Sequence, residues 1–353
     1  MSVLNFASDN VGPAAPEVMT ALADANAAAH MPYGADRFTD RAEALVREVL
    51  EAPEAAVHLV ATGTAANALA LATLTQPWQA IFCHHAAHVE LDEAGAVEFY
   101  SAGAKLRLVP GASGKMSPEA LLAVIDGVPE GDVSSVQRGP VTLAQLTEAG
   151  TAYTVTEITA LTAVAHARGL KVHMDGARIA NAIAAATCTP AEMITSAGID
   201  ALSLGGTKNG CLGVEAVVIL DPEKAWELSM RRKRAGQTWS KHRFLGAQMA
   251  AYLKNGLWLD LAARANAAMA VLLEGLSEMP EARLADSPGG NVAFLDLPAA
   301  MHRRAHAAGA QYYLFDADGP DVPEDAPLRC RIVCDWSKTD EDVAALLALW
   351  RSS

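Results

Sequence analysis

Short apolar runs alternate with helical patterns along the middle of the chain, and this alternation is what most limits the possible folds. Each run is short and ends in glycine or polar residues, which is typical of a buried strand. We expect strands at residues 57–61, 80–83, 105–109, 141–146, 170–174, 199–204 and 214–220, and helices at 65–74, 118–125, 158–168 and 190–197. The pattern predicts an α/β fold with a mostly parallel sheet covered by helices on both faces.

The two ends of the chain have a different texture. We expect helices at residues 14–29, 42–50, 222–234, 244–255 and 257–276, then strands at 291–297, 311–315 and 328–334 with helices at 299–308 and 339–350. The chain of 353 residues is long enough for one large and one smaller domain. We expect an N-terminal segment at 1–20, a large domain at 21–250 and a small C-terminal α+β domain at 251–353.

Two of the expected strands lead into residues that can do chemistry. Asp175 follows the run at 170–174, and Lys208 lies in the glycine-rich turn 203–210 after the next run. Active loops of a parallel α/β sheet lie at the carboxyl ends of its strands, so these two side chains should meet. Pyridoxal 5′-phosphate (PLP) needs such a pair, an amine that forms a Schiff base and a carboxylate that keeps the pyridine nitrogen protonated. The sequence therefore predicts a PLP enzyme with Lys208 and Asp175 as catalytic residues.

A phosphate site is expected where the first of these strands turns into a helix. Gly63 lets the backbone approach an anion there, Thr64 adds a hydroxyl, and free N–H groups point out of the helix start. Thr207, beside the lysine, is a second candidate phosphate ligand. An ordinary helix cap is the alternative for this turn. GxxxxGK[ST] and GxGxxG are absent, which argues against a P-loop and a dinucleotide site.

Arginine and histidine residues complete the candidate site. Arg178 follows Asp175 by three residues and is either a ligand for a substrate carboxylate or the PLP 3′-oxygen, or a surface residue. His84, His85 and His88 are clustered, but no second set of ligands accompanies them at metal-site spacing, so we expect no metal. One of the three is expected to stack on the flat cofactor or to act as a base. The basic run 231–234 is either a solvated helix face or a phosphate contact across a subunit interface.

Composition limits the partners and the compartment. The net charge of −14 argues against nonspecific binding to nucleic acid or anionic membranes. The five cysteines are odd in number and include no CxxC pair, which favours reduced thiols. We recognise no signal peptide and no apolar run of the ~20 residues that span a bilayer. A soluble cytoplasmic protein is expected.

Several motifs occur together in a characteristic order. They are SDN, PYG followed by D, TGTxAN, AAH followed by EAG, HMDGARIANA, and the lysine turn followed by RRKRAG. From Asn5 to Arg331 the chain resembles the low-specificity L-threonine aldolases of the β-eliminating lyase family, which are fold type I PLP enzymes. The resemblance implies a seven-stranded sheet sandwiched by helices, plus the small domain. It also implies a homo-oligomer, a dimer of dimers with active sites at subunit interfaces.

The resemblance implies a reaction and a set of roles. The reaction is retro-aldol cleavage of L-3-hydroxy-α-amino acids, such as L-threonine, L-allo-threonine or phenylserine, to glycine and an aldehyde. PLP-dependent β-elimination, dehydration or racemisation is the alternative, and a PLP-binding protein without catalysis is a more distant one. The implied cofactor ligands are Lys208, Asp175, Arg178, Gly63, Thr64, His88 stacked on the ring, and Arg232 from the neighbouring subunit. Ser8, Arg178 and Arg331 would hold the substrate carboxylate, Tyr33 would lie at the shared mouth, and His88 or a water it orients would be the base.

This chain departs from the family in one segment near the substrate. Many members carry a histidine, close to the substrate hydroxyl, where this chain has residues 146–151 with the sequence LTEAGT. Its absence leaves the preferred substituent at Cβ open. A threonine also precedes Lys208 where other members have a serine.

Overall fold

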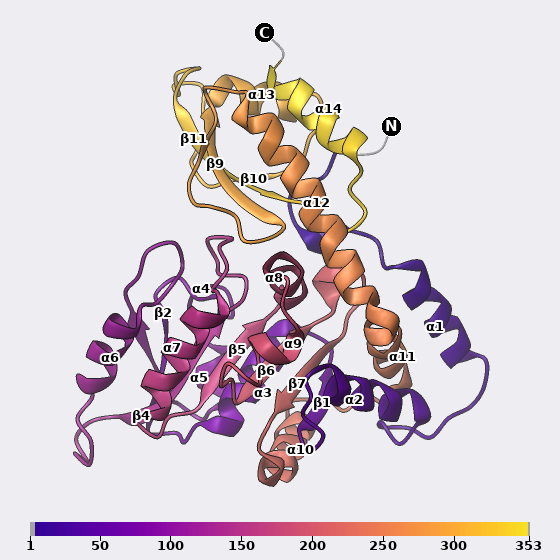
Figure 1. Ribbon diagram of the computed structural model, residues 1–353, viewed down its shortest axis with the longest axis vertical. Coiled ribbons are helices and arrows are strands. Elements are labelled where there is room, and N and C mark those ends of the chain that lie inside the picture. The colour runs from indigo at the N-terminus through magenta and orange to yellow at the C-terminus, as the bar shows by residue number, and fades with distance from the viewer. Residues whose placement is uncertain (1–3, 352–353) are drawn as a thin grey trace.

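The computed structural model describes residues 4–351, and its larger sheet has seven strands (Figure 1). The strands are β1 (Ala56–Val60), β2 (Gln79–His84), β3 (Lys105–Val109), β4 (Gln137–Ala144), β5 (Val172–Gly176), β6 (Ala201–Gly205) and β7 (Glu215–Ile219). They lie in the order β1-β7-β6-β5-β4-β2-β3. Only β7 runs antiparallel to its neighbours, β1 and β6. The predicted mostly parallel seven-stranded sheet is confirmed.

Helices cover both faces of this sheet. Successive side chains of a strand point to opposite faces, and in most of these strands apolar residues point to both. Val57 and Leu59 pack into the core that includes α6 (Pro118–Asp126) and α7 (Val155–His166). Ala56 and Val60 pack into the opposite core, beneath α3 (Gly63–Leu74) and α10 (Ala225–Arg234). On that face α5 (Ala96–Tyr100) also packs on α3. The Ala/Leu-rich sequence of α3 suits its place between the sheet and these helices.

Capping residues define several helix starts. Ser117 caps α6 as predicted, since its hydroxyl accepts a hydrogen bond from Ala120 N. Asp36 caps α2 (Arg37–Val49) through Phe38 N and Thr39 N, so this helix begins earlier than expected. Residues 16–26 form α1 (Pro16–Asn26), which is shorter than expected, and the helix at 190–197 is reduced to α9 (Pro190–Met193). Three short helices, α4 (His88–Leu91), α5 and α8 (Ile179–Ala186), were not expected.

A second, antiparallel sheet forms the C-terminal part of the molecule. Its strands β8 (Arg283–Leu284), β9 (Val292–Pro298), β10 (Tyr313–Leu314) and β11 (Pro327–Val333) lie in the order β10-β11-β9-β8. Helices α13 (Ala299–Ala307) and α14 (Asp340–Arg351) pack in the same core. The predicted small α+β domain is confirmed as part of the fold class.

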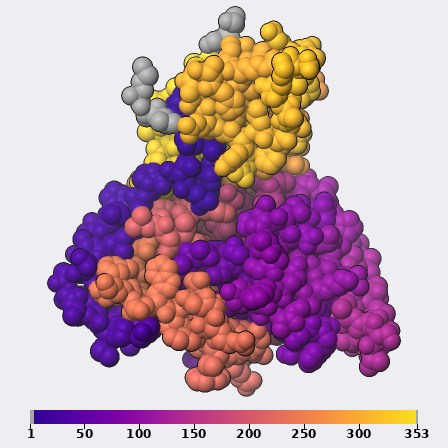
Figure 2. Space-filling model, turned by 180° about the vertical axis from the view of Figure 1, so that it is seen from behind, coloured from indigo at the N-terminus to yellow at the C-terminus, as the bar shows by residue number. Residues whose placement is uncertain are grey.

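Two segments join the large part and the small part of the molecule, helix α12 (Leu257–Ser277) and the N-terminal residues. Helix α12 runs from the large part, where it contacts α8, to the small part, where it contacts α14 (Figure 1). The N-terminal residues lie along the junction (Figure 2). There Asn5 bridges to Gln311 and Phe6 is buried in the core of the small part. The expected domain limits at residues 20 and 250 stay a prediction. The segment before residue 20 contributes Phe6 to the core of the small part and Val18 to that of the large part, and α12, which follows residue 250, contacts both parts.

We expected no apolar run long enough to span a bilayer, but one stretch of helix meets that criterion. Residues Arg243–Ser277 are long and apolar enough to cross a membrane, by length and composition alone. In the structure Asn255 has a φ of 55° and separates this stretch into α11 (Arg243–Leu253) and α12. Helix α11 packs on α1 and α2, and α12 packs on α8 and α14. Core helices of this kind meet the same criteria, so the stretch carries no argument for a membrane.

Candidate active site

A cavity of about 280 Å³ lies beside the carboxyl ends of β1, β5 and β6. Seven of the residues singled out in the sequence line it: Gly63, Thr64, His88, Asp175, Arg178, Thr207 and Lys208. They come from separate segments that the parallel strands deliver to one edge of the sheet. The cavity is therefore the candidate active site.

Lys208 is presented by a tight turn that follows β6. It lies in a short 3-10 helix (Thr207–Asn209), and Gly210 ends that helix with a φ of 102°, a conformation that favours glycine. Arg178 and burial together lower the pKa of Lys208. A lowered pKa favours the neutral amine, which is the nucleophilic form that attacks a carbonyl carbon.

The carboxylate of Asp175 is fixed in position by two hydrogen bonds. Its Oδ1 accepts from Ala177 N at 3.0 Å and its Oδ2 accepts from Asn67 Nδ2 at 2.8 Å. The same Asn67 amide donates to Glu93 Oε1 at 2.8 Å. Because Asn67 belongs to α3, its hydrogen bond links the first turns of α3, where the phosphate is expected, to Asp175 at the end of β5.

Glu93 also holds His88. His88 Nδ1 donates to Glu93 Oε1 at 2.8 Å, and this hydrogen bond raises the pKa of His88. Ligand atoms of His88, Glu93 and Asp175 lie within 4.8 Å of one another, as in a possible metal site. The hydrogen bonds of these residues with one another and with Asn67 account for the grouping without an ion. The expectation of no metal stays a prediction.

The turn before α3 leaves space for an anion. The Thr62 hydroxyl caps α3 by accepting from Ala65 N at 3.1 Å, so the ordinary cap falls to Thr62. Gly63 and Thr64 remain at the cavity wall. A Cβ added to Gly63 would meet no atom within 4 Å, so the fold itself does not require glycine at this position. An open backbone at a helix start, beside two threonine hydroxyls, is suited to a phosphate.

Arg178 is neutralised by an acid that the sequence did not reveal. Its Nε donates to Asp9 Oδ2 at 2.7 Å and its Nη2 donates to Oδ1 at 3.1 Å. Burial raises the pKa of Asp9, but the charge and hydrogen bonds of Arg178 outweigh it and hold this pKa below its usual value. Among residues 4–351, Nη1 of Arg178 makes no hydrogen bond, so this nitrogen can donate to a ligand.

Ser8 and Arg331 lie beside this ion pair without lining the cavity. The Ser8 hydroxyl caps the turn Asp9–Val11 by accepting from Asn10 N. Arg331 Nη2 donates to Ala7 O at 3.1 Å, and its guanidinium lies 5.1 Å from the centre of the Tyr313 ring. The N-terminal turn thus brings two of the expected carboxylate ligands from opposite ends of the chain to Arg178.

Arg232 and Tyr33 also lie outside the lining of the cavity of their own chain. Arg232 is only 9% exposed, and its Nη1 lies 3.4 Å from His242 Nε2. Tyr33 is half exposed, and Lys233 Nζ lies 5.1 Å from the centre of its ring. The roles of both residues in a neighbouring subunit stay predictions.

The residues present fit PLP. A lysine with a lowered pKa, a fixed carboxylate, an open helix start and an arginine share one cavity, and each supplies what one part of that cofactor requires. A further acid, Glu215, lines the same cavity and accepts a hydrogen bond from Gly206 N at 2.7 Å. Burial raises the pKa of Glu215 to about 7. Glu215 was not among the residues expected from the sequence.

Comparison with known proteins agrees with this geometry. The family model of the β-eliminating lyases matches residues 5–297. The chain belongs to this family. A low specificity L-threonine aldolase of Pseudomonas aeruginosa is 37% identical to it over 97% of this chain and 95% of the relative. The family resemblance expected from the motifs is confirmed, and the chain is a lyase.

Solved structures extend the comparison. A threonine aldolase of Leishmania major has a TM-score of 0.90 and 26% identity, covering 98% of each chain. A serine palmitoyltransferase determined with PLP has a TM-score of 0.71 and 16% identity, covering 99% of this chain and 86% of that one. The second likeness shows the fold alone, and together the two confirm the predicted fold of type I PLP enzymes.

Proposed function

We propose that this protein is a PLP-dependent lyase that cleaves L-3-hydroxy-α-amino acids, such as L-threonine, L-allo-threonine or phenylserine, to glycine and an aldehyde. The observation that carries the proposal is the meeting of Lys208, Asp175, Arg178 and the Gly63 turn in one cavity. The likeness to a low specificity L-threonine aldolase over nearly the whole chain supports the substrate class.

Several of the cavity residues would hold the cofactor. Lys208 would be its attachment point, and Asp175 would keep the pyridine nitrogen protonated. Gly63, Thr64 and Thr207 would bind the phosphate, and His88, fixed by Glu93, would cover the ring. Bound PLP supplies a cationic conjugated ring that accepts the electron pair left on Cα.

The substrate is held by its carboxylate. Arg178 binds it through the guanidinium edge that Asp9 leaves free, and Ser8 and Arg331 approach from the N-terminal turn and β11. Fixing the carboxylate orients the bonds at Cα, and this orientation decides which bond breaks. Cleavage of the Cα–Cβ bond then requires removal of the proton from the β-hydroxyl group.

We also propose a cytoplasmic homo-oligomer, a dimer of dimers, in which Tyr33 and Arg232 contribute to the neighbouring active site. Met31, Tyr33 and Trp239 are exposed, and Tyr33 N donates to Ser240 O, so these apolar side chains come from adjoining segments. Exposed apolar groups of this kind favour contact with another subunit. The five free cysteines support a reducing compartment.

Replacement of the lysine tests the proposal. The purified protein with PLP should show the visible absorbance band of a lysine-bound cofactor and release glycine and acetaldehyde from L-threonine. Lys208→Ala should lose the band and lower the cleavage rate by at least about 10³-fold. Lys171→Ala, which removes an exposed lysine paired with Asp200, is the matched control and should keep both.

The other outcomes separate the alternatives. Release of a keto acid and ammonia by the unaltered protein would replace aldol cleavage with elimination on the same site. Undiminished activity of Lys208→Ala would refute the site assignment.

A further inference from the structure

Glu148 lies in the loop that follows β4, and this loop is rigidly held. Thr147 N donates to Thr151 O at 2.9 Å, and the hydroxyls of the two threonines lie 2.8 Å apart. Thr151 Oγ1 also donates to Ser113 O at 2.7 Å. These bonds close a tight turn whose tip carries Glu148, so its side chain is presented from a fixed backbone.

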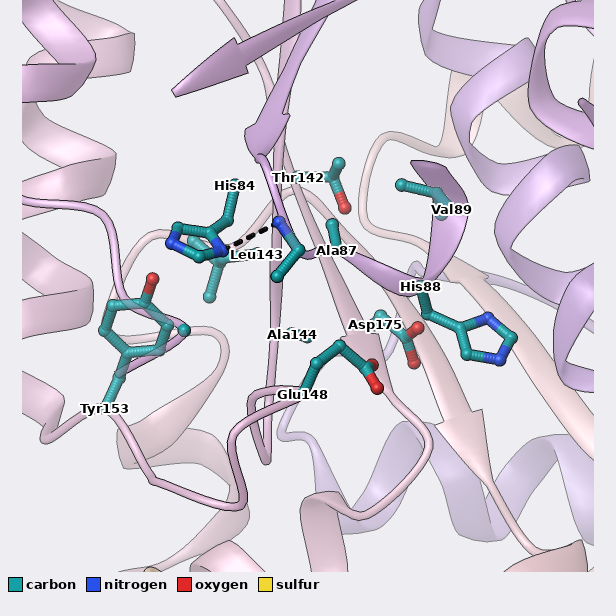
Figure 3. A pocket seen from close by; sticks show the side chains of 12 residues that line it. His84, Ala87, His88, Val89, Thr142, Leu143, Ala144, Glu148, Tyr153 and Asp175 are labelled. Carbon is teal, nitrogen blue, oxygen red and sulfur yellow. Dashed lines mark hydrogen bonds between the residues drawn. The ribbon is translucent and has the colours of Figure 1, made fainter. Parts of the chain in front are cut away.

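The Glu148 side chain points toward Asp175 and His88 (Figure 3). It lines the 280 Å³ cavity together with both of them. The same three residues line a second cavity of only about 10 Å³, on the side of His84 and Tyr153. That space holds about one water at most. A substrate must therefore occupy the larger cavity, and Glu148 forms part of its wall.

Glu148 differs from the other acids of this cavity region in having no donor. Asp9, Glu93, Asp175 and Glu215 each accept at least one hydrogen bond. Within residues 4–351, no hydrogen bond or ion pair reaches the carboxylate of Glu148. A half-buried carboxylate without a donor has lost part of its hydration, and no hydrogen bond from the protein replaces it. Binding of a polar ligand group beside the carboxylate is therefore favourable.

The charged groups around Glu148 keep it within reach of the reaction. Its charge contributes to the raised pKa of His88 and of Arg178, and it opposes the lowering of the pKa of Lys208 by Arg178 and burial. Burial raises the pKa of Glu148 itself, with a further rise from Asp175, while Arg178, His88 and Lys208 oppose it. A carboxylate with a raised pKa is a stronger base than an ordinary one.

We propose that Glu148 accepts the proton of the substrate β-hydroxyl group, and that it makes the site selective for amino acids with a hydroxyl at Cβ. The O–H bond breaks and its proton moves to a Glu148 oxygen. The Cβ–O bond becomes the aldehyde carbonyl, the Cα–Cβ bond breaks, and its electron pair remains on Cα. Glycine forms when Cα takes up one proton, so the proton gained by Glu148 balances the proton needed at Cα. This inference rests on the proposed aldol cleavage.

His88, the base expected from the sequence, is less suited to this step. Its Nδ1 donates to Glu93, so one of its two ring nitrogens is already engaged. The carboxylate of Glu148 accepts no hydrogen bond within residues 4–351, so its lone pairs are free to take the proton. His88 is left with the role of covering the cofactor ring.

Substitution of Glu148 by residues of matched shape tests the inference in the PLP-loaded enzyme. Glu148→Gln keeps the size but cannot accept the proton, so kcat for L-threonine should fall by about 10²- to 10⁴-fold. Glycine carries no hydroxyl, and its affinity, measured from the change in the cofactor absorbance, should change by less than about threefold. Glu148→Asp keeps the carboxylate and should restore part of the rate. Glu119→Gln, a change at the exposed start of α6, is the control and should behave as wild type.

The pH profile supplies a second readout. Because the base must be deprotonated, the wild-type kcat should fall as the pH falls through the raised pKa of Glu148, and Glu148→Gln should lack this acidic limb. A kcat of Glu148→Gln within about threefold of wild type, or an equal loss of glycine affinity, would overturn the inference. If the wild type itself releases no glycine from L-threonine, the proposed function fails instead.

Discussion

Gly63 begins α3 at the wall of the cavity, where a Cβ would meet no atom within 4 Å. We predict that Gly63→Ala leaves the unfolding free energy unchanged or slightly higher, because alanine favours a helix more than glycine does. The added methyl group occupies the space next to the phosphate, so PLP should bind about tenfold more weakly, or worse. Fluorescence titration of the cofactor-free protein measures this affinity.

The matched control for this change is Gly319→Ala. A Cβ on Gly319 also meets nothing within 4 Å, but Gly319 lies outside the cavity. Equal PLP affinity of the Gly63→Ala and Gly319→Ala proteins would show that the phosphate does not approach Gly63.

The sequence revealed those site residues that have a recognisable pattern next to them in the chain. Lys208 and Asp175 were found because each follows an apolar strand, and Gly63 because it begins a helix. Asp9 was missed because its partner Arg178 lies 169 residues away, and Asn67 because its partner Asp175 lies 108 residues away. Both residues lie in motifs quoted above, SDN and TGTxAN, but such pairs exist only once the strands have assembled, so the motifs alone gave neither residue a role.

Helices α2 and α11 pack with almost no space between their backbones at Gly246. A Cβ added there would lie 2.5 Å from Thr39 N and 2.7 Å from Phe38 C. We predict that Gly246→Ala forces these helices apart and lowers the free energy of unfolding by about 1–3 kcal/mol. Urea unfolding of the two proteins measures the difference.

Gly275→Ala in α12 is the comparison for this variant. The obstacle there is the side chain of Leu347, which can rotate away, so the loss of stability should be smaller than at Gly246. A larger loss at Gly275 would contradict the account of backbone contact between α2 and α11.

Strands were predicted better than short helices. Strands β5, β6 and β7 are buried along their whole length, and their largely apolar composition is visible in the sequence. Helix α4 follows Ala87 and α8 follows Arg178, and neither residue makes a side-chain cap, so no start signal precedes them. Strand β8 has only two residues and is defined by its pairing with β9, which the sequence does not show.

The stability of the whole molecule should depend on pH through Glu215. Its pKa is about 7 in the fold, against an ordinary value of 4.5. Protons bound at Glu215 therefore favour the folded state, and their loss between pH 4.5 and 7 removes about 3 kcal/mol of stability. We predict that the cofactor-free Glu215→Gln protein lacks this decline, because its amide does not titrate.

Urea unfolding at several pH values measures the effect. The difference in unfolding free energy between Glu215→Gln and wild type should grow as the pH rises from 4.5 to 7. A constant difference across this range would show that folding does not raise the pKa of Glu215.

The architecture of the large part could be predicted from the alternation of strands and helices, whereas the joining of the two parts could not. Phe6 belongs to the core of the small part, and Asn5 bridges to Gln311 near the other end of the chain. The sequence around Asn5 and Phe6 carries no periodic pattern. Contacts with the small part, rather than the local sequence, therefore determine where these residues lie.

Helix α12 has 21 residues and is about 31 Å long. Its base adjoins Asn255, and the small sheet packs on its residues 268–276, toward the far end. A rotation of about 2° at the base displaces the far end by about 1 Å. A displacement of that size can cost about 10²-fold in rate. The helix is thus a lever arm, and a small change of angle at its base would shift Arg331 relative to Arg178, although the base is many residues from any reacting atom.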